Sequence, residues 1–235
     1  IRNYLEFDLE QYKILQLYAE KQEIDFIVTA FDINSLNFLQ TIEIELIKIA
    51  SHSLTNIDLL EHIAKTKISS ILSTGMADIS EIDTAVNIFK KNHCSLSLMH
   101  CVSSYPTPIN ECNLSLIEFL EKRYGLITGY SGHEIGFFPT IIAVALGAKI
   151  IERHITTDKN LEGFDHKISL EPNELKEMVV QIRNIQTVKG SKEKKVSEVE
   201  KITRNKYHVS MTSIKELKKG EILKKSMISF KNPGT

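Results

Sequence analysis

The sequence predicts an α/β fold, in which six of the eight strands of a (β/α)8 barrel are followed by a small β-rich module. Short apolar runs start about 20 to 30 residues apart, amphipathic segments lie between them, and polar residues follow where the runs end. Because strand and helix alternate, we expect parallel strands joined by right-handed crossovers. A closed barrel has eight strands, so we expect the missing two upstream of residue 1. The six predicted strands are residues 25–29, 45–50, 69–74, 95–101, 125–129 and 149–154.

Helical segments precede the first strand and separate most of the others. The first helix is expected over residues 9–21. A polar loop, residues 156–166, follows the sixth strand, and Glu171 beside Pro172 is typical of the start of a final helix. The other predicted helical segments are residues 57–64, 79–89, 114–120, 136–146 and 172–188.

The chain divides into three predicted parts. Residues 1–188 form the partial barrel. Residues 189–201 are rich in lysine and have no apolar period, which favours a linker over an anion-binding patch. Residues 202–235 carry short β-like runs around Lys218-Lys219-Gly220-Glu221. The chain begins at Ile1 without an initiator methionine and stops at Thr235 after a turn-like Asn-Pro-Gly, so we expect a fragment.

Composition excludes several classes of protein. The net charge of −1 gives no overall attraction to nucleic acid or membrane surfaces. No apolar run approaches the roughly 20 residues that a membrane-spanning helix needs, and no signal peptide is present. The three cysteines, Cys94, Cys101 and Cys112, lack disulfide or metal spacing, and Cys101 is expected to be a buried reduced thiol. The odd count favours a reducing cytoplasm.

Two histidines follow neighbouring predicted strands. His133 comes after the fifth strand and His154 ends the sixth. If these strands are parallel neighbours, both imidazoles lie at the C-terminal rim, where barrels of this class carry their chemistry. Two imidazoles on one rim can ligate a divalent metal ion. The alternative is that each is an ordinary surface or hydrogen-bonded core histidine.

Lys48 lies inside an otherwise apolar strand, where a buried ammonium needs an anionic partner. A lysine surrounded by hydroxyls suits a phosphate or carboxylate ligand. The alternative for Lys48 is a paired or snorkelling lysine, and the alternative for each hydroxyl is a cap at a strand end. Asp165 is a candidate to hold a sugar hydroxyl or water, and the alternative is that it is only a turn residue. The hydroxyl residues near the predicted strand ends are Thr29, Ser51, Ser73, Ser103, Tyr105 and Ser131.

Six short motifs of this sequence, which follow one another in chain order from residue 48 to residue 166, resemble motifs of the bacterial sialic acid synthase family. That family includes N-acetylneuraminate, legionaminate and pseudaminate synthases. The resemblance covers nearly the whole chain, and the tail from about Ile202 is similar to the start of the antifreeze-like (SAF) domain of that family. The motifs are residues 48–51, 71–76, 100–108, 129–133, 152–154 and 163–166.

The resemblance implies a TIM-barrel transferase (EC 2.5.1) that condenses phosphoenolpyruvate with an open-chain N-acylated amino sugar such as N-acetylmannosamine. The products are a nine-carbon 2-keto acid and phosphate. His133 and His154 match metal ligands, usually for Mn²⁺, with Mg²⁺ or Co²⁺ as alternatives, and the metal acts as a Lewis acid on the aldehyde oxygen. The family also implies a cytoplasmic homodimer in which antifreeze-like domains are exchanged.

The same resemblance assigns the polar residues. Tyr105 and Asp165 match positions that face the sugar, and Lys48, like the two histidines, matches a catalytic position. The residues that match phosphoenolpyruvate positions are Lys48, Ser51, Ser73 and Ser131, with Thr29 and Ser103 as further candidates.

Three departures from the family pattern leave the sugar open. The upstream strands, which would supply a water-handling carboxylate and a further lysine, are absent from the sequence. Ser53 stands where many members that use N-acetylmannosamine have Glu, and Asn232 stands where the antifreeze-like domain usually has Arg. The alternatives are another phosphoenolpyruvate-dependent 3-deoxy keto acid synthase and a catalytically inactive barrel fragment. We expect the 235-residue piece alone to be inactive and to fold poorly.

Overall fold

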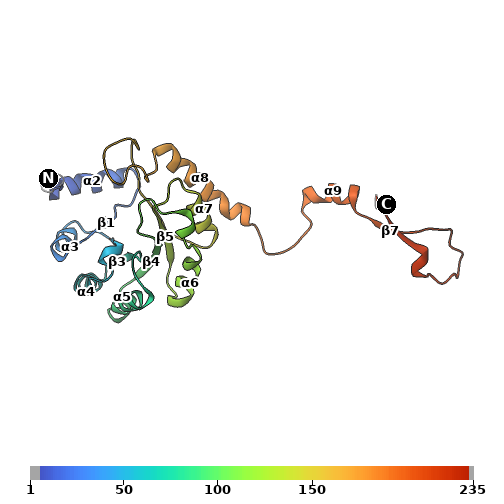
Figure 1. Cartoon of the computed structure of the whole chain (residues 1–235), viewed down its shortest axis with the longest axis horizontal. Helices are drawn as coiled ribbons and strands as arrows, with labels where there is room; N and C mark the ends of the chain where they lie inside the picture. The colour runs from blue at the N-terminus through green and yellow to red at the C-terminus, as the bar shows by residue number, and fades with distance from the viewer. Residues whose placement is uncertain (1–5, 233–235) are drawn as a thin grey trace. The chain divides into compact units, whose positions relative to one another are not determined.

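Six parallel strands form one curled sheet in the computed structural model, which describes residues 6–232 (Figure 1). Their spatial order is their sequence order, β1-β2-β3-β4-β5-β6, and every neighbouring pair is parallel. The predicted α/β class with six parallel strands is therefore confirmed as a half-barrel. The strands are β1 (Val28–Thr29), β2 (Leu46–Ile49), β3 (Ser69–Ser73), β4 (Leu96–Cys101), β5 (Thr128–Gly132) and β6 (Ile151–Arg153).

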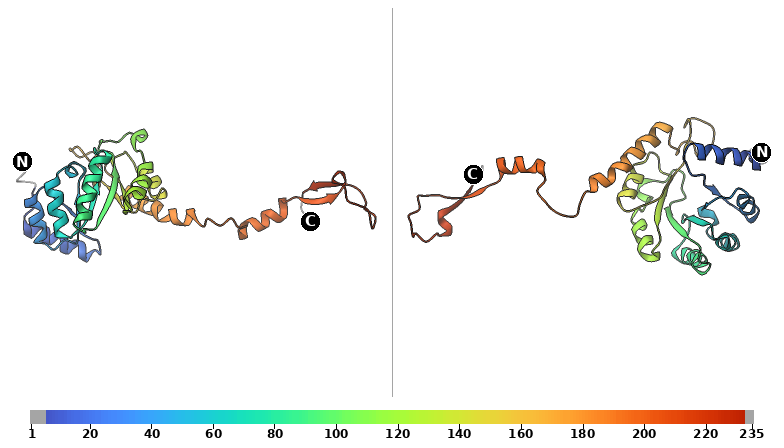
Figure 2. Two further views of the ribbon diagram at one scale, coloured as in Figure 1. Left: turned by 90° about the horizontal axis from the view of Figure 1, so that it is seen from below. Right: turned by 180° about the vertical axis from the view of Figure 1, so that it is seen from behind.

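An arc of helices covers the outer side of the sheet (Figures 1 and 2). Helix α2 (Leu9–Lys21) precedes β1, and α8 (Pro172–Lys189) follows the loop after β6. Helix α3 was not singled out from the sequence, although Asp32 marks its start by accepting a hydrogen bond from the Ser35 amide at 2.7 Å. The helices between strands are α3 (Ile33–Gln40), α4 (Ile57–Thr66), α5 (Ile79–Lys91), α6 (Ser115–Tyr124) and α7 (Phe138–Ala145), with short 3₁₀ turns η1 (Ser51–Ser53) and η2 (Ile109–Glu111).

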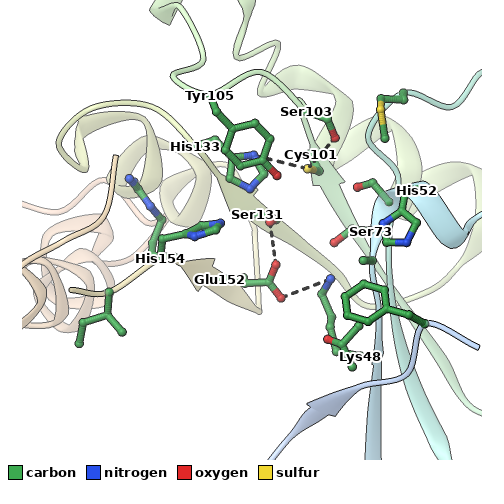
Figure 3. Close-up of a pocket in the computed structure, with 17 residues that line it drawn as sticks. Lys48, His52, Ser73, Cys101, Ser103, Tyr105, Ser131, His133, Glu152 and His154 are labelled. Carbon is green, nitrogen blue, oxygen red and sulfur yellow. Dashed lines mark hydrogen bonds and ion pairs between the residues drawn. The ribbon is translucent and has the colours of Figure 1, made fainter. Parts of the chain in front are cut away.

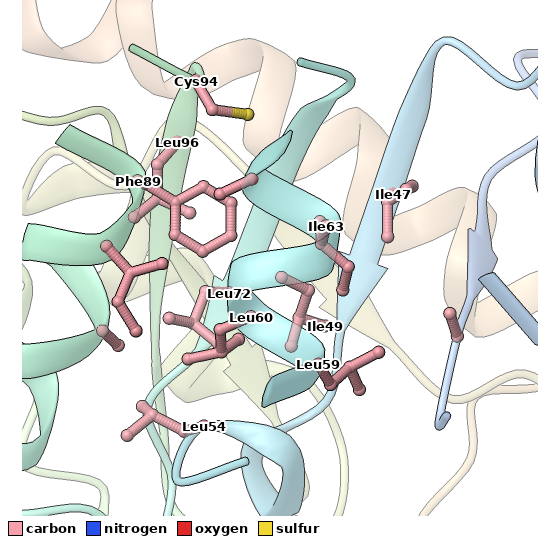
Figure 4. Packing of buried hydrophobic residues seen from close by; sticks show 14 of the residues in the cluster. Ile47, Ile49, Leu54, Leu59, Leu60, Ile63, Leu72, Phe89, Cys94 and Leu96 are labelled. Atoms are coloured by element: carbon pink, nitrogen blue, oxygen red, sulfur yellow. The ribbon is translucent and has the colours of Figure 1, made fainter. Parts of the chain in front are cut away.

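The main apolar core lies between the strands and this arc of helices. Ile47 and Ile49 of β2 are fully buried in one cluster with Leu72 of β3 and with Leu60 and Ile63 of α4 (Figure 4). Successive strand side chains point to opposite faces of a sheet. A strand whose alternate residues fill this core therefore directs the residues between them into the interior of the curl, where a polar site can form.

The fifth strand begins later than predicted. The expected strand was residues 125–129, but β5 spans Thr128–Gly132. Gly125 instead ends α6 in the left-handed region with φ +65°, a conformation that glycine adopts without a Cβ clash. The shift places Ser131 inside the strand and makes His133 the first residue after it.

The remaining residues, Gly190–Thr235, form a separate unit. Within the stretch predicted as a linker, Ser197 and Glu200 form a capping box that starts helix α9 (Glu198–Tyr207). Strands β7 (Ser210–Ser213) and β8 (Ile228–Lys231) then pair antiparallel, with the short 3₁₀ turn η3 (Lys225–Met227) before β8. The ends of the two predicted domains, residues 1–5 and 233–235, lie outside the described residues. None of the described helices is both long enough and apolar enough to cross a membrane.

Candidate active site

A pocket of about 750 Å³ lies at the C-terminal ends of the six strands (Figure 3). Every candidate site residue except Asp165 lines this pocket, and the roles assigned to these residues stay predictions. The predicted residues in its wall are Thr29, Lys48, Ser51, Ser73, Ser103, Tyr105, Ser131, His133 and His154.

His133 and His154 directly follow two neighbouring parallel strands, β5 and β6. The last residue pair between β5 and β6 is Gly132 with Arg153, and each histidine is the next residue along its strand. The two rings have centroids 5.3 Å apart, which is close enough for one ion to contact both. The Nδ1 of His133 donates to the Val102 carbonyl at 3.0 Å, which fixes the tautomer and leaves Nε2 free to ligate. This donor set fits a divalent metal that binds imidazole.

The two histidines differ in their electrostatic surroundings. Burial lowers the pKa of His154, although the Asp165 carboxylate opposes this shift. Burial also disfavours the charged form of His133, but its hydrogen bonds to Cys101 and Val102 outweigh burial and raise its pKa. A neutral imidazole is the form that binds metal, and burial favours that form at His154. Within residues 6–232, no group of three or more His, Cys, Asp and Glu side chains is arranged to hold a metal.

Lys48 finds its anionic partner in Glu152. The lysine is 8% exposed, and its Nζ lies 3.4 Å from the Glu152 Oε2. The other carboxylate oxygen of Glu152 accepts a hydrogen bond from Ser131 at 2.9 Å (Figure 3). Glu152 lies within one of the sequence motifs but is not among the predicted site residues. Strand alternation could have located it, because Ile151 packs in the core and the following residue must face inward.

The hydroxyls of the pocket differ in how they are used. The Ser73 Oγ is buried and has no hydrogen-bond partner among the described residues, so it retains its full capacity for a ligand. The Ser51 Oγ accepts from the Gly75 amide at 3.1 Å. A Cβ on Gly75 would lie 2.3 Å from the Ser103 Oγ and 2.8 Å from the Ser51 Oγ. Glycine at this position therefore allows the ends of β2, β3 and β4 to approach one another.

Ring systems and a thiol complete the wall of the pocket. The Tyr105 ring lies over His133, with centroids 4.1 Å apart. Phe31 and His52 stack with their centroids 5.1 Å apart, and neither was predicted to line the site. Cys101 is free and buried, as expected, and lies 3.9 Å from the Nδ1 of His133. Burial raises the pKa of this thiol, but hydrogen bonds with His133 and Ser51 outweigh burial and lower it overall.

Three residues of the sugar-recognition hypothesis lie elsewhere. Asp165 is outside the pocket wall, with its Oδ2 3.7 Å from the Nδ1 of His154. Ser53 is buried in η1, so the neighbouring His52 presents its ring to the pocket instead. Asn232 belongs to the second unit, where its side chain donates to the Tyr207 carbonyl.

Comparisons with known proteins agree with the motifs. The N,N'-diacetyllegionaminic acid synthase of Campylobacter jejuni is 43% identical over 97% of this chain and 70% of that protein. The Legionella pneumophila enzyme of the same name is 37% identical over 98% of this chain and 66% of its own length. The crystal structure of N-acetylneuraminic acid synthetase from Leptospira borgpetersenii, in complex with citrate, is 41% identical with a TM-score of 0.79, covering 85% of this chain and 71% of that one. The chain thus spans about two thirds of the length of these relatives. Because the NeuB family model also matches residues 1–194, this chain belongs to the NeuB family of sialic acid synthases.

Proposed function

We propose that this protein condenses phosphoenolpyruvate with the open-chain form of an N-acylated amino sugar, giving a nine-carbon 2-keto acid and phosphate. The observation that carries the proposal is one pocket that holds both a pair of imidazoles and a lysine-hydroxyl cradle. The first suits a metal that activates a carbonyl, and the second suits an anionic donor. Family membership and relatives named for legionaminic and sialic acid synthesis support the same reaction class.

The cradle would hold phosphoenolpyruvate through charge and hydroxyl donors. Lys48 supplies the positive charge, and the unpaired Ser73 Oγ supplies a donor that no protein group uses within the described chain. Ser131 and Lys48 both contact Glu152, so an anion that binds there must compete with this carboxylate. Glu152 therefore holds Lys48 and Ser131 in place before the substrate arrives.

The imidazole pair would hold the metal. A divalent ion, with Mn²⁺ first and Mg²⁺ or Co²⁺ as alternatives, would supply Lewis acidity to the aldehyde oxygen of the sugar. His133 is oriented for this role by its hydrogen bond to Val102, and His154 lies across from it on β6. The Tyr105 ring contacts both imidazoles and lines the pocket, where it can position the sugar.

The proposed reaction joins the two substrates through one new carbon–carbon bond and releases phosphate. A carbon–carbon bond forms between C3 of phosphoenolpyruvate and the aldehyde carbon, and the aldehyde oxygen gains a proton to become a hydroxyl. Water adds at C2 of the former enol, and phosphate leaves from C2 with its bridging oxygen. The result is the 2-keto acid. Lys48 and the hydroxyls hold the donor while its phosphate departs, and His133 and His154 hold the acceptor end.

The cations of the pocket favour an acceptor without a phosphate. Among the described residues, the pocket wall contains one lysine, Lys48, and one arginine, Arg153. Arg153 is bound to the buried Glu134 carboxylate at 2.6 Å. Lys48, whose partner Glu152 is 40% exposed, is therefore the cation better placed to bind a substrate anion. This distribution supports a neutral acylamino sugar over a sugar phosphate. The cytoplasmic location is proposed on the odd cysteine count and on family membership, and the homodimer with exchanged antifreeze-like domains on family membership alone.

An acceptor panel tests the proposal. The purified protein is incubated with phosphoenolpyruvate, Mn²⁺ and either N-acetylmannosamine, a diacetamido hexose or a hexosamine phosphate. We expect phosphate release and a mass equal to sugar plus pyruvate with one of the first two sugars. Loss of both signals after chelation, with recovery on adding Mn²⁺, is expected as well. Preference for the phosphorylated sugar would overturn the acceptor assignment, and no product with any acylamino sugar would overturn the function.

A further inference from the structure

A buried ion pair joins the two chain segments that carry the histidines. Glu134 directly follows His133, and Arg153 directly precedes His154. The Arg153 Nη1 donates to the Glu134 Oε1 at 2.6 Å, and the side chains are 3% and 0% exposed. A charge removed from water needs hydrogen-bond partners. The Arg153 Nε is buried and has none among the described residues, whereas Arg153 Nη1 and Nη2 and the Glu134 carboxylate are partnered.

The carboxylate of Glu134 is fully supplied with donors. Tyr130 donates its hydroxyl to Oε2 at 2.9 Å, and Thr140 donates to Oε1 at 3.0 Å. Arg153 also donates through Nη2 to the backbone carbonyl of Glu134 at 2.8 Å, so it holds both the side chain and the main chain. The network connects β5, β6 and the first turn of α7.

The Glu134–Arg153 ion pair lies at the point where the hydrogen-bonded pairing of β5 and β6 ends. The last residue pair between β5 and β6 is Gly132 with Arg153, so no further ladder pair links the residues that follow. The His133 carbonyl accepts from Thr107 at 3.1 Å, and the His154 carbonyl accepts from Leu170 at 2.8 Å. Each of these contacts ties one histidine to a different loop. Beside the ring contacts of the two histidines, the Glu134–Arg153 pair links one histidine segment to the other through hydrogen bonds.

A close approach at Gly132 supports the same conclusion. A Cβ at this position would lie 2.6 Å from the Glu134 Oε2 and 2.8 Å from a Tyr130 ring carbon. The carboxylate of Glu134 therefore folds back over the strand end, into space that only glycine leaves open. The main chain at the end of β5 is shaped around this ion pair.

We propose that Glu134 and Arg153 are positioning residues that set the separation of His133 and His154 and thereby the affinity of the protein for a divalent metal. The inference rests on the proposed function, because it needs the two histidines to be the ligands. Neither residue is assigned to substrate. Outer contacts of metal ligands commonly change metal affinity by roughly 10- to 100-fold when they are removed.

The test compares two carboxylates with the same kinds of partner. Glu134→Gln keeps the shape and removes the charge that Arg153 binds. The matched control is Asp83→Asn, because Asp83 accepts from Arg123 at 2.7 Å and from Tyr124 at 2.8 Å, on helices α5 and α6 and outside the pocket. Free Mn²⁺ is titrated by its electron paramagnetic resonance signal. Phosphoenolpyruvate affinity without metal and the melting temperature are measured on the same samples.

We expect Glu134→Gln to weaken Mn²⁺ binding by roughly 10-fold or more, with phosphoenolpyruvate affinity within about twofold of wild type, whereas Asp83→Asn leaves Mn²⁺ affinity unchanged. Thr140→Val, which removes one donor to Glu134, gives a smaller loss in the same direction and serves if Glu134→Gln does not fold. Unchanged Mn²⁺ affinity in the folded variants, with wild-type binding that depends on His154, would overturn the inference and leave the proposed function intact. Wild-type protein that binds no Mn²⁺ would overturn the metal site itself, and the inference with it.

Discussion

Replacing Lys48 by methionine tests the anion cradle, because this amine is the pocket cation that no buried carboxylate holds. Methionine keeps the unbranched shape and removes the charge. Charge-assisted hydrogen bonds contribute about 1.5–3 kcal/mol, which corresponds to a loss of roughly 10- to 100-fold in affinity for phosphoenolpyruvate. The Glu152 side chain is 40% exposed and keeps its hydrogen bond from Ser131, so leaving it without Lys48 should cost at most about 1 kcal/mol of stability.

Isothermal titration calorimetry of phosphoenolpyruvate and of the sugar, with a thermal melt, separates binding from folding. Lys159→Met is the matched control, because Lys159 also pairs with a glutamate, Glu174, at 2.6 Å but does not line the pocket. We expect Lys48→Met to weaken phosphoenolpyruvate binding and to leave the affinity for the sugar and the melting temperature nearly unchanged. We expect Lys159→Met to leave the affinity for phosphoenolpyruvate unchanged. Equal phosphoenolpyruvate affinity in Lys48→Met and wild type would refute the cradle.

Three further substitutions probe the metal, the hydroxyls and the core. After chelation, adding Mn²⁺ should restore the activity of the wild type but not that of His154→Ala. Full activity of this variant would show that His154 is not a metal ligand. Ser73→Ala should weaken phosphoenolpyruvate binding by about 1 kcal/mol, roughly fivefold. Ser70→Ala should not, because the Ser70 hydroxyl donates to the Ile68 carbonyl outside the pocket. Equal losses of affinity in the two variants, measured by calorimetry, would argue against a specific contact. Leu60→Ala should reduce the free energy of unfolding by about 2–5 kcal/mol, measured by urea denaturation, and a smaller loss would mean that the site collapses around the cavity.

Much of the site could be predicted because parallel strands end at a common edge. The order of the motifs placed Lys48, Ser131 and both histidines on one rim without any knowledge of distances. Strand boundaries were less certain where helix and strand signals meet. The apolar residues before Thr128 suggested an early fifth strand, and the left-handed glycine that ends α6 moved it by three residues.

The ion pairs could not be predicted, because they depend on register. Lys48 was expected to need an anion, but its partner Glu152 lies four strands away across the curl. Glu134 and Arg153 stand beside the two histidines in the sequence, yet which charges meet is decided by how β5 and β6 pair. A one-residue shift of that register would turn the opposite set of side chains toward the pocket.

Anomalous diffraction at the manganese edge, from a crystal grown with Mn²⁺ and phosphoenolpyruvate, tests the central claim most directly. The account predicts one manganese peak within ligating distance of His133 and His154, and phosphoenolpyruvate beside Lys48 and Ser73. Manganese bound away from both histidines, or phosphoenolpyruvate bound outside this pocket, would contradict it.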